Sequence, residues 1–171
     1  MKKPGGRFIF LDIDGVLNRG HDSSKGGFQW SAVECVEALN LITEATGAEI
    51  VVSSAWRHSH TLNGLRKVLK KWGVTGKVTD VTPSHLMGGF DEEEGRNLTV
   101  PRIEEIAWWL RKEPGEVNSF VILDDNDPQI GIDFDHPIPH LEPHIVLTDT
   151  RLGLTEEQAE KAILILENTA D

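Results

Sequence analysis

Short apolar runs alternate along the chain with longer stretches in which apolar residues recur every three to four positions. Runs of four or five apolar residues that end at polar side chains are typical of strands buried on both faces of a parallel sheet. Apolar residues spaced three and four positions apart, such as Leu62, Leu65 and Leu69, are typical of amphipathic helices. The pattern predicts strands at residues 7–11, 48–52, 77–81, 120–123 and 144–147.

The predicted helices have local start and stop signals, because polar side chains cap helix starts and glycine ends helices in the left-handed conformation. These signals predict helices at residues 31–45, 61–72, 101–110 and 155–167. The signals are Ser31 with Glu34, Thr155 with Gln158, Gly47 and Gly73 as stops, and Pro101 in a first turn.

Strands that alternate with helices favour an α/β fold, here a three-layer sandwich with a central, mainly parallel five-stranded sheet. Glycine, proline and charged residues predict loops at residues 18–30, 83–97 and 128–143. A length of 171 residues fits a single domain over residues 1–171.

Composition narrows the classes of protein that need to be considered. A net charge of −11 argues against binding a polyanion through a long-range field, so any nucleic-acid contact must be local. One cysteine, Cys35, excludes an internal disulfide and a multi-thiolate metal site. The sequence has no apolar run of membrane-spanning length and no apolar leader, so we expect no membrane association and a cytoplasmic location.

Three predicted strands end in the polar residues that one chemistry requires. Ligands of open parallel sheets bind outside the carboxyl ends of the strands. Five carboxylates gathered there would repel one another without a cation, and oxygen ligands suit Mg²⁺. The sequence therefore predicts a magnesium site. The strand-end residues are Asp12 and Asp14, then Ser53 and Ser54, then Asp124, Asp125 and Asp127.

The residues at these strand ends resemble the motifs of the haloacid dehalogenase (HAD) superfamily of phosphohydrolases. The stretch FLDIDGVLN over residues 10–18 is similar to its first motif, VVSS over 51–54 to its second, and VILDD over 121–125 to its fourth. Within the superfamily, residues 52–57, 102–110 and 144–155 are similar to the small HAD domains associated with RNA-repair proteins.

The resemblance implies a HAD-like Rossmannoid fold and a phosphomonoesterase that forms an aspartyl-phosphate. Asp12 would be the nucleophile, and Asp14 would protonate the leaving oxygen and then activate water, because one carboxyl cannot do both. Gly15 would allow the tight turn that presents both acids, and Ser53, with Ser54 nearby, would hydrogen-bond the phosphoryl group.

The resemblance also implies the metal ligands and a cation that holds the phosphoryl group. Mg²⁺ would be held by Asp12, the Asp14 carbonyl and Asp125, with help from Asp124, and would neutralise phosphoryl charge. The superfamily's third motif is a Lys or Arg. Arg102 is the candidate here, with Arg96 as the alternative.

The segments after the first and second motifs are too short for a full cap domain, so we expect an open site that suits a large substrate. A basic strip with no acid in it follows the second motif, and it is either a solvated helix face or a nucleic-acid contact. Arg57, next to Ser53, is a candidate to touch phosphate. The strip consists of Arg57, His58, His60, Arg66, Lys67, Lys70 and Lys71.

Several other residues have alternative readings. Trp56 or Trp30 could stack on a base, although the tryptophans are expected mainly in the core. His136, His140 and His144 lack the spacing of a second metal site. Asp127 is either a further acidic ligand or the cap of a turn. Cys35 is expected to be buried and inert.

The expected activity is hydrolysis of phosphorylated RNA or DNA ends or of nucleotides by a monomer. The alternatives are a phosphoprotein or small-metabolite phosphatase, and a non-catalytic module that binds RNA or a partner. Retention of Asp14 speaks against the non-catalytic module, since a bare Mg²⁺ site needs no proton shuttle. A response-regulator receiver domain is disfavoured because its acidic pair and phosphoacceptor occur in the opposite order.

Overall fold

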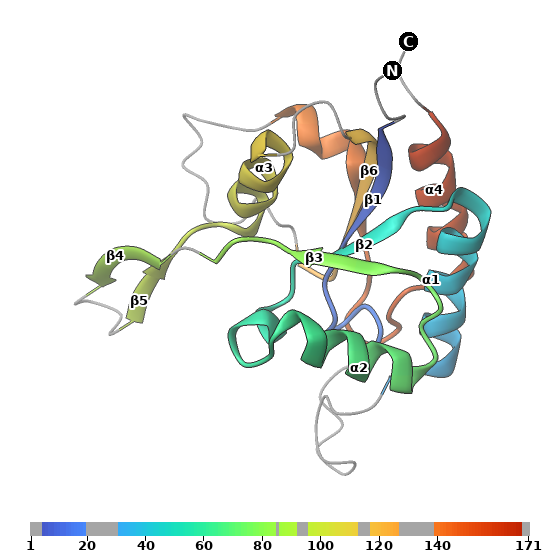
Figure 1. The fold of residues 1–171 in the computed structure, drawn as a ribbon, viewed down its shortest axis with the longest axis horizontal. Coiled ribbons are helices and arrows are strands. Elements are labelled where there is room, and N and C mark those ends of the chain that lie inside the picture. Colours follow the sequence, from blue (N-terminus) through green and yellow to red (C-terminus); the bar gives the residue numbers. More distant parts are fainter. Residues whose placement is uncertain are drawn as a thin grey trace.

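The structure is a computed structural model that describes residues 5–19, 31–84, 86–91, 96–112, 117–126 and 139–168. Its central sheet has five parallel strands in the order β3-β2-β1-β6-β7 (Figure 1). The strand order reverses between β1 and β6, which is where open α/β sheets bind their ligands. The strands are β1 (Gly6–Leu11), β2 (Glu49–Val52), β3 (Val78–Val81), β6 (Val117–Asp124) and β7 (Ile145–Leu147).

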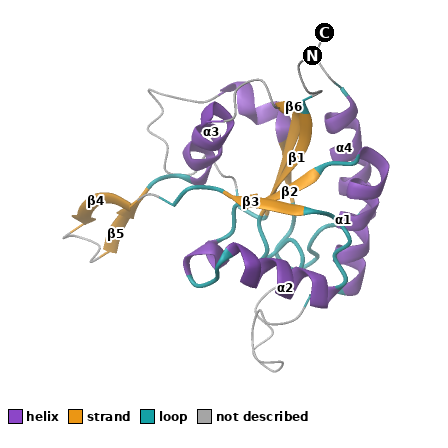
Figure 2. Cartoon of the chain, viewed as in Figure 1, coloured by secondary structure: helices purple, strands orange, loops and turns teal. Residues whose placement is uncertain are grey.

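Helices cover both faces of the sheet and confirm the predicted three-layer sandwich (Figure 2). The helices α1 (Val33–Thr46), α2 (Leu62–Trp72) and α4 (Glu156–Glu167) pack on the face that includes Ile9 and Leu11. The helix α3 (Arg102–Lys112) packs on the opposite face against Phe10. Alternate β1 residues thus enter separate cores, which explains why this strand is apolar throughout.

Two of the three predicted start signals are confirmed. Pro101 directly precedes α3, and Thr155 with Gln158 forms a complete capping box at α4. Thr61, which carries no predicted signal, caps α2 by accepting a hydrogen bond from the Gly64 amide. The predicted Ser31 cap is wrong, because α1 starts at Val33 with Ala32 in the cap position and no side-chain cap. The Ala32 amide instead donates to the Leu17 carbonyl at 2.8 Å, and this backbone contact fixes the entry into the helix.

The loop predicted at residues 83–97 is also corrected. β4 (Leu86–Asp91) and β5 (Arg96–Thr99) form an antiparallel hairpin with Phe90 opposite Asn97, and the hairpin lies beyond the carboxyl end of β3 (Figure 1). Glycines in the first strand weaken the strand pattern that sequence analysis depends on. The described residues form no cap domain over the sheet, as predicted. Two short 3₁₀ helices, η2 (Ala55–His58) and η3 (Pro139–His144), complete the fold.

Candidate active site

The hydrogen-bond ladder of the sheet continues one residue past each strand and aligns the polar residues at its carboxyl edge. Leu11 of β1 is in register with Val52 of β2 and Leu123 of β6. Beyond this row, the Asp12 amide donates to the Leu123 carbonyl and the Ser53 amide to the Leu11 carbonyl, each at 2.9 Å. Asp12, Ser53 and Asp124 therefore lie in neighbouring positions at the carboxyl edge of the sheet, as the sequence predicts.

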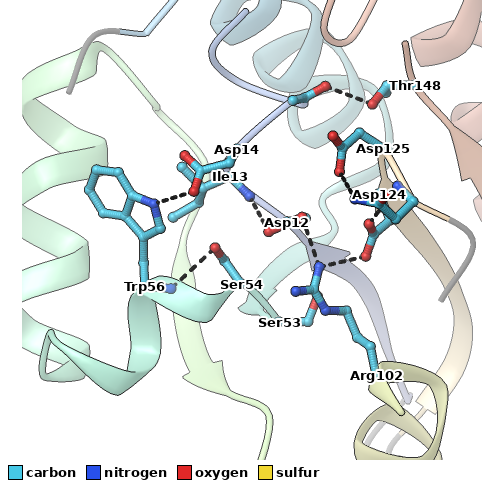
Figure 3. A network of polar contacts seen from close by, with 12 residues as sticks. Asp12, Ile13, Asp14, Ser53, Ser54, Trp56, Arg102, Asp124, Asp125 and Thr148 are labelled. Carbon is cyan, nitrogen blue, oxygen red and sulfur yellow. Dashed lines mark hydrogen bonds and ion pairs between the residues drawn. The ribbon is translucent and has the colours of Figure 1, made fainter. Parts of the chain in front are cut away.

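Arg102 lies between two of these acids. Its Nη1 is 2.8 Å from Asp12 Oδ2 and 2.7 Å from Asp124 Oδ2 (Figure 3). Burial raises the pKa of Asp12, although Arg102 and the Ile13 amide counteract this. Burial also raises the pKa of Asp124 to about 6, again against the effect of Arg102. The two carboxylates raise the pKa of Arg102, so it remains the permanent cation at this position.

A third carboxylate joins this pair to make a candidate cation site. Ligand oxygens of Asp12, Asp124 and Asp125 lie within 4.8 Å of one another, and within the described part of the chain this is the one such group. Thr150 Oγ1 and Asn126 Nδ2 each donate to Asp125 at 2.7 Å, which orients its carboxylate. Three carboxylates and one guanidinium leave a formal charge of −3 + 1 = −2, which suits a divalent cation.

Gly15 is required by the backbone at this point. It has a φ of +75°, and a Cβ there would collide with the Asp125 carboxylate. Its carbonyl accepts a 2.8 Å hydrogen bond from the Thr148 hydroxyl, and its amide donates to Asn18 Oδ1 at 2.8 Å. The predicted tight turn is confirmed, and the space beside Gly15 is filled by Asp125.

Asp14 is held apart from the three-carboxylate group by two donors. Trp56 Nε1 donates to Asp14 Oδ2 at 2.9 Å (Figure 3). Asn18 Nδ2 donates to Asp14 Oδ1 at 2.8 Å. Trp56 lies on η2, and its ring stacks with that of His60 at a centroid separation of 5.2 Å. Local patterns predict Trp56 as a base-stacking or core residue but not this contact, because the two partners are 42 positions apart.

The two serines after β2 have different surroundings. The Ser54 hydroxyl accepts from the Trp56 amide at 3.3 Å, and its hydrogen bond to Asp12 opposes in part the rise that burial causes in the pKa of Asp12. The Ser53 hydroxyl is fully buried and has no partner among the described residues. Ser54 is therefore the serine in contact with the predicted nucleophile, whereas the Ser53 hydroxyl is unused.

Arg57 differs from its predicted role as a phosphate contact. Its Nη1 donates to the carbonyls of Ser53 and Ser54 at 2.9 and 2.7 Å, and its Nη2 pairs with Glu105 of α3. The side chains of Arg57 and Glu105 are only 6% and 5% exposed. Arg57 therefore stabilises the turn after β2 through these two carbonyls, and the Glu105 carboxylate balances its charge.

The basic strip is divided by the direction of α2. A helix that connects parallel strands runs antiparallel to them, so its carboxyl end lies at the amino edge of the sheet. Lys70 and Lys71 occupy the last turn of α2 and are therefore distant from the strand ends, which favours the solvated-face alternative for these two residues. Arg66 is bound to the Val78 carbonyl at 2.8 Å, whereas Lys67 is exposed.

Other candidates lie away from the site or outside the described residues. His144 Nδ1 contacts the Phe120 carbonyl at 2.9 Å and the ring stacks on Phe120, which gives it a packing role. Cys35 is buried as predicted, and burial raises the pKa of its thiol. Trp30, Asp127 and His136, together with the side chains of Arg96 and His140, lie outside the described residues.

A comparison with protein families agrees with this geometry. The family described as "HAD domain in Swiss Army Knife RNA repair proteins" matches residues 8–159. The chain belongs to this family. The match extends from the middle of β1 into α4, so the HAD domain includes all the strand ends described above. Membership indicates HAD-type hydrolase chemistry and an association with RNA repair.

Comparisons with curated proteins and with solved structures gave no significant match. Within the described part of this HAD domain, none of the helices has the length and apolar character needed to cross a bilayer.

Proposed function

We propose that this HAD domain is a Mg²⁺-dependent phosphomonoesterase that acts through Asp12 on phosphorylated nucleic-acid ends or nucleotides. The observation that carries the proposal is the convergence of Asp12, Asp124 and Asp125 within 4.8 Å. Buried carboxylates in such a group need a cation, and one guanidinium neutralises only part of their charge.

The residues fit magnesium because the donor set contains only oxygen. Asp12, Asp124 and Asp125 would hold the ion through their carboxylates, and the Asp14 carbonyl is proposed as a further ligand. Bound Mg²⁺ would offset the negative charge of the phosphoryl group that otherwise repels a carboxylate nucleophile. Asn126 and Thr150 would orient the ligand Asp125, as partners of metal ligands commonly do.

The proposed reaction has two displacements at phosphorus, the first by Asp12 and the second by water, and Asp14 transfers the proton in each. The Asp12 carboxylate attacks phosphorus, the P–O bond to the alcohol breaks, and the leaving oxygen takes a proton from Asp14. Asp14 then removes a proton from water, which attacks the aspartyl-phosphate and releases phosphate with Asp12 restored. In this proposal Arg102, the Ser54 hydroxyl and the unused Ser53 hydroxyl bind phosphoryl oxygens, which their contacts with Asp12 or their lack of a partner support.

The position of Asp14 supports this division of work. Its two oxygens accept hydrogen bonds from Trp56 and Asn18, whereas Asp12 is bound to Arg102 and the Ile13 amide. Two carboxylates in separate networks can act independently, one as nucleophile and the other as acid and base. A module that only bound RNA or a partner would not require this second network.

The substrate class rests on the family and on the open site. A phosphate at the end of a polymer fits an active site over which the described residues form no cap domain, and the matched family is named for RNA repair. A phosphoprotein or a small metabolite is the alternative substrate. A comparison of 3′- and 5′-phosphorylated oligonucleotides, nucleoside monophosphates and phosphopeptides at equal concentration separates these alternatives.

The test of the mechanism is Asp12→Asn, which keeps the shape of the side chain but removes the nucleophile. We expect hydrolysis of an aryl phosphate to fall at least a thousandfold, and EDTA to abolish it reversibly in the unmodified protein. Asp149→Asn is the matched control, since Asp149 is a loop acid paired with Arg151 outside the three-carboxylate group. Turnover that persists in Asp12→Asn, or in the presence of EDTA, would refute the mechanism.

A further inference from the structure

A hollow lies at the carboxyl end of β3, between η2 and α3. It has a volume of about 420 Å³, and the Thr82 amide donates to the Val52 carbonyl at 3.0 Å at its base. The hollow is large enough for a small organic ring system. We call it the β3-end cleft. Its lining includes Arg57, Asp80, Thr82, Ser84, Trp108 and Trp109.

One face of α3 connects the β3-end cleft with the phosphoryl site. Arg102, Glu105 and Trp109 are spaced three and four residues apart, so they lie on the same side of the helix. Arg102 reaches Asp12 and Asp124, Glu105 binds Arg57, and Trp109 Nε1 donates to Asp80 at 2.8 Å. At 1.5 Å per residue, the rise along the helix axis from Arg102 to Trp109 is about 10 Å. A spacing on this scale is compatible with a nucleotide, in which one sugar joins the base to the phosphate.

The walls of the β3-end cleft favour a flat, uncharged, aromatic ligand. Trp108 supplies aromatic surface, and tryptophan is a good stacking partner for nucleobases. Trp109 is only 5% exposed and packs against Phe8 and Phe10, so it supports the wall from the core. Among the described lining residues Arg57 is the one cation, and it is already neutralised by Glu105, while Asp80 adds a carboxylate. A second phosphate would therefore be repelled by Asp80 without a free positive charge to hold it.

The same cleft carries hydrogen-bonding groups that lack partners. Arg57 Nε and Thr82 Oγ1 are buried and have no hydrogen-bond partner within the described part of the chain. A buried donor without a partner costs free energy, and such groups commonly mark a place that a ligand completes. Arg57 Nε can donate, and the Thr82 hydroxyl can donate or accept. Asp80 already accepts from Trp109 Nε1 and the Val81 amide, and its carboxylate oxygens keep further lone pairs. This mixture matches the edge of a nucleobase.

We propose that the β3-end cleft binds the base of the nucleotide whose phosphate is hydrolysed at Asp12. The proposal rests on the proposed phosphatase function and deepens it, because it makes a nucleotide or a nucleic-acid end the substrate and disfavours phosphopeptides. The base enters between Trp108 and the end of β3, and its edge supplies the partners that Arg57 and Thr82 lack. Arg57 connects the two sites, since its other face holds the Ser53 and Ser54 carbonyls.

The test compares kcat/KM for nucleoside 3′- and 5′-monophosphates with kcat/KM for ribose 5-phosphate, which has no base. We expect the unmodified protein to prefer the better nucleotide at least tenfold, since base stacking on an aromatic side chain contributes about that much or more. Trp108→Ala should reduce this ratio at least tenfold. Thr82→Val should change the order of preference among the four bases. Leu164→Ala is the control, because Leu164 is 64% exposed on α4 across the sheet, and its ratio should equal that of the unmodified protein.

A binding measurement keeps the proposal separable from the mechanism. Asp12→Asn protein is titrated with adenosine and with uridine, and quenching of tryptophan fluorescence is followed before and after the Trp108→Ala change. Binding that depends on Trp108 supports the cleft even if no phosphate ester is hydrolysed. A substrate ratio near one, a ratio unchanged in Trp108→Ala, or no nucleoside binding at millimolar concentration would overturn the proposal while leaving Asp12 chemistry intact.

Discussion

The buried pair of Arg57 and Glu105 offers a direct test of how the active-site turn is held. Both side chains are almost fully buried, and Arg57 also supplies hydrogen bonds to the carbonyls of Ser53 and Ser54. Replacing Arg57 with Met keeps most of the side-chain volume but leaves the Glu105 carboxylate buried without a counter-charge. The change should therefore destabilise the domain far more than the loss of a surface ion pair.

The expected magnitude follows from this burial. Removing one partner of a buried ion pair costs about 3–5 kcal/mol, because the remaining charge has lost its compensation. For a domain of this size, each kcal/mol corresponds to about 2–4 °C, so the unfolding midpoint should fall by about 6–20 °C. Arg57→Met combined with Glu105→Leu removes the stranded charge as well. That double variant should recover all but about 1–2 kcal/mol, the remainder being the two carbonyls that lose their donor.

Urea unfolding monitored by tryptophan fluorescence measures these free energies in the unmodified protein, both single variants and the double variant. Arg151→Met is the control for a charge change at the surface, since Arg151 pairs with Asp149 in an exposed position, and its midpoint should be almost unchanged. The reasoning is refuted if Arg57→Met costs less than about 1 kcal/mol, or if the double variant is no more stable than the single ones.

Two further predictions concern the three-carboxylate group. Gly15→Ala and Gly47→Ala both place a Cβ on a left-handed residue and should each cost about 1–2 kcal/mol, but the new methyl collides with Asp125 only at Gly15 and meets nothing within 4 Å at Gly47. Calorimetric titration should therefore show weaker Mg²⁺ binding in Gly15→Ala alone, and equal affinities in the two variants would contradict the assigned geometry. Second, Mg²⁺ must displace the proton of Asp124, whose pKa burial raises to about 6, so affinity should be constant above pH 7 and fall as the pH drops below 6. The same titration at pH 5.0 and 7.5 tests this, and an affinity independent of pH would show that Asp124 is not a ligand.

The elements of the fold were predictable where their signals are local. The cap at Thr155 needs only Gln158 three residues away, and the buried strand ending at Leu11 is legible from its own apolar run. The order of strands and acids along the chain also predicted that Asp12, Ser53 and Asp124 would meet, because parallel strands align their carboxyl ends. The hairpin at residues 86–99 was missed, since antiparallel pairing across a turn leaves little periodicity when one strand contains glycines.

The sequence by itself determined the strands, the helices and the acids at the strand ends. Tertiary structure decided the partners of those acids. Arg102 reaches Asp12 across 90 positions, Trp56 reaches Asp14 across 42, and Arg57 is turned inward by Glu105 across 48. Local signals depend on residues within about four positions, which share a turn or a strand whatever the fold. Contacts between distant segments depend on strand register and on which helix face packs against the sheet, and these are fixed only when the whole core assembles.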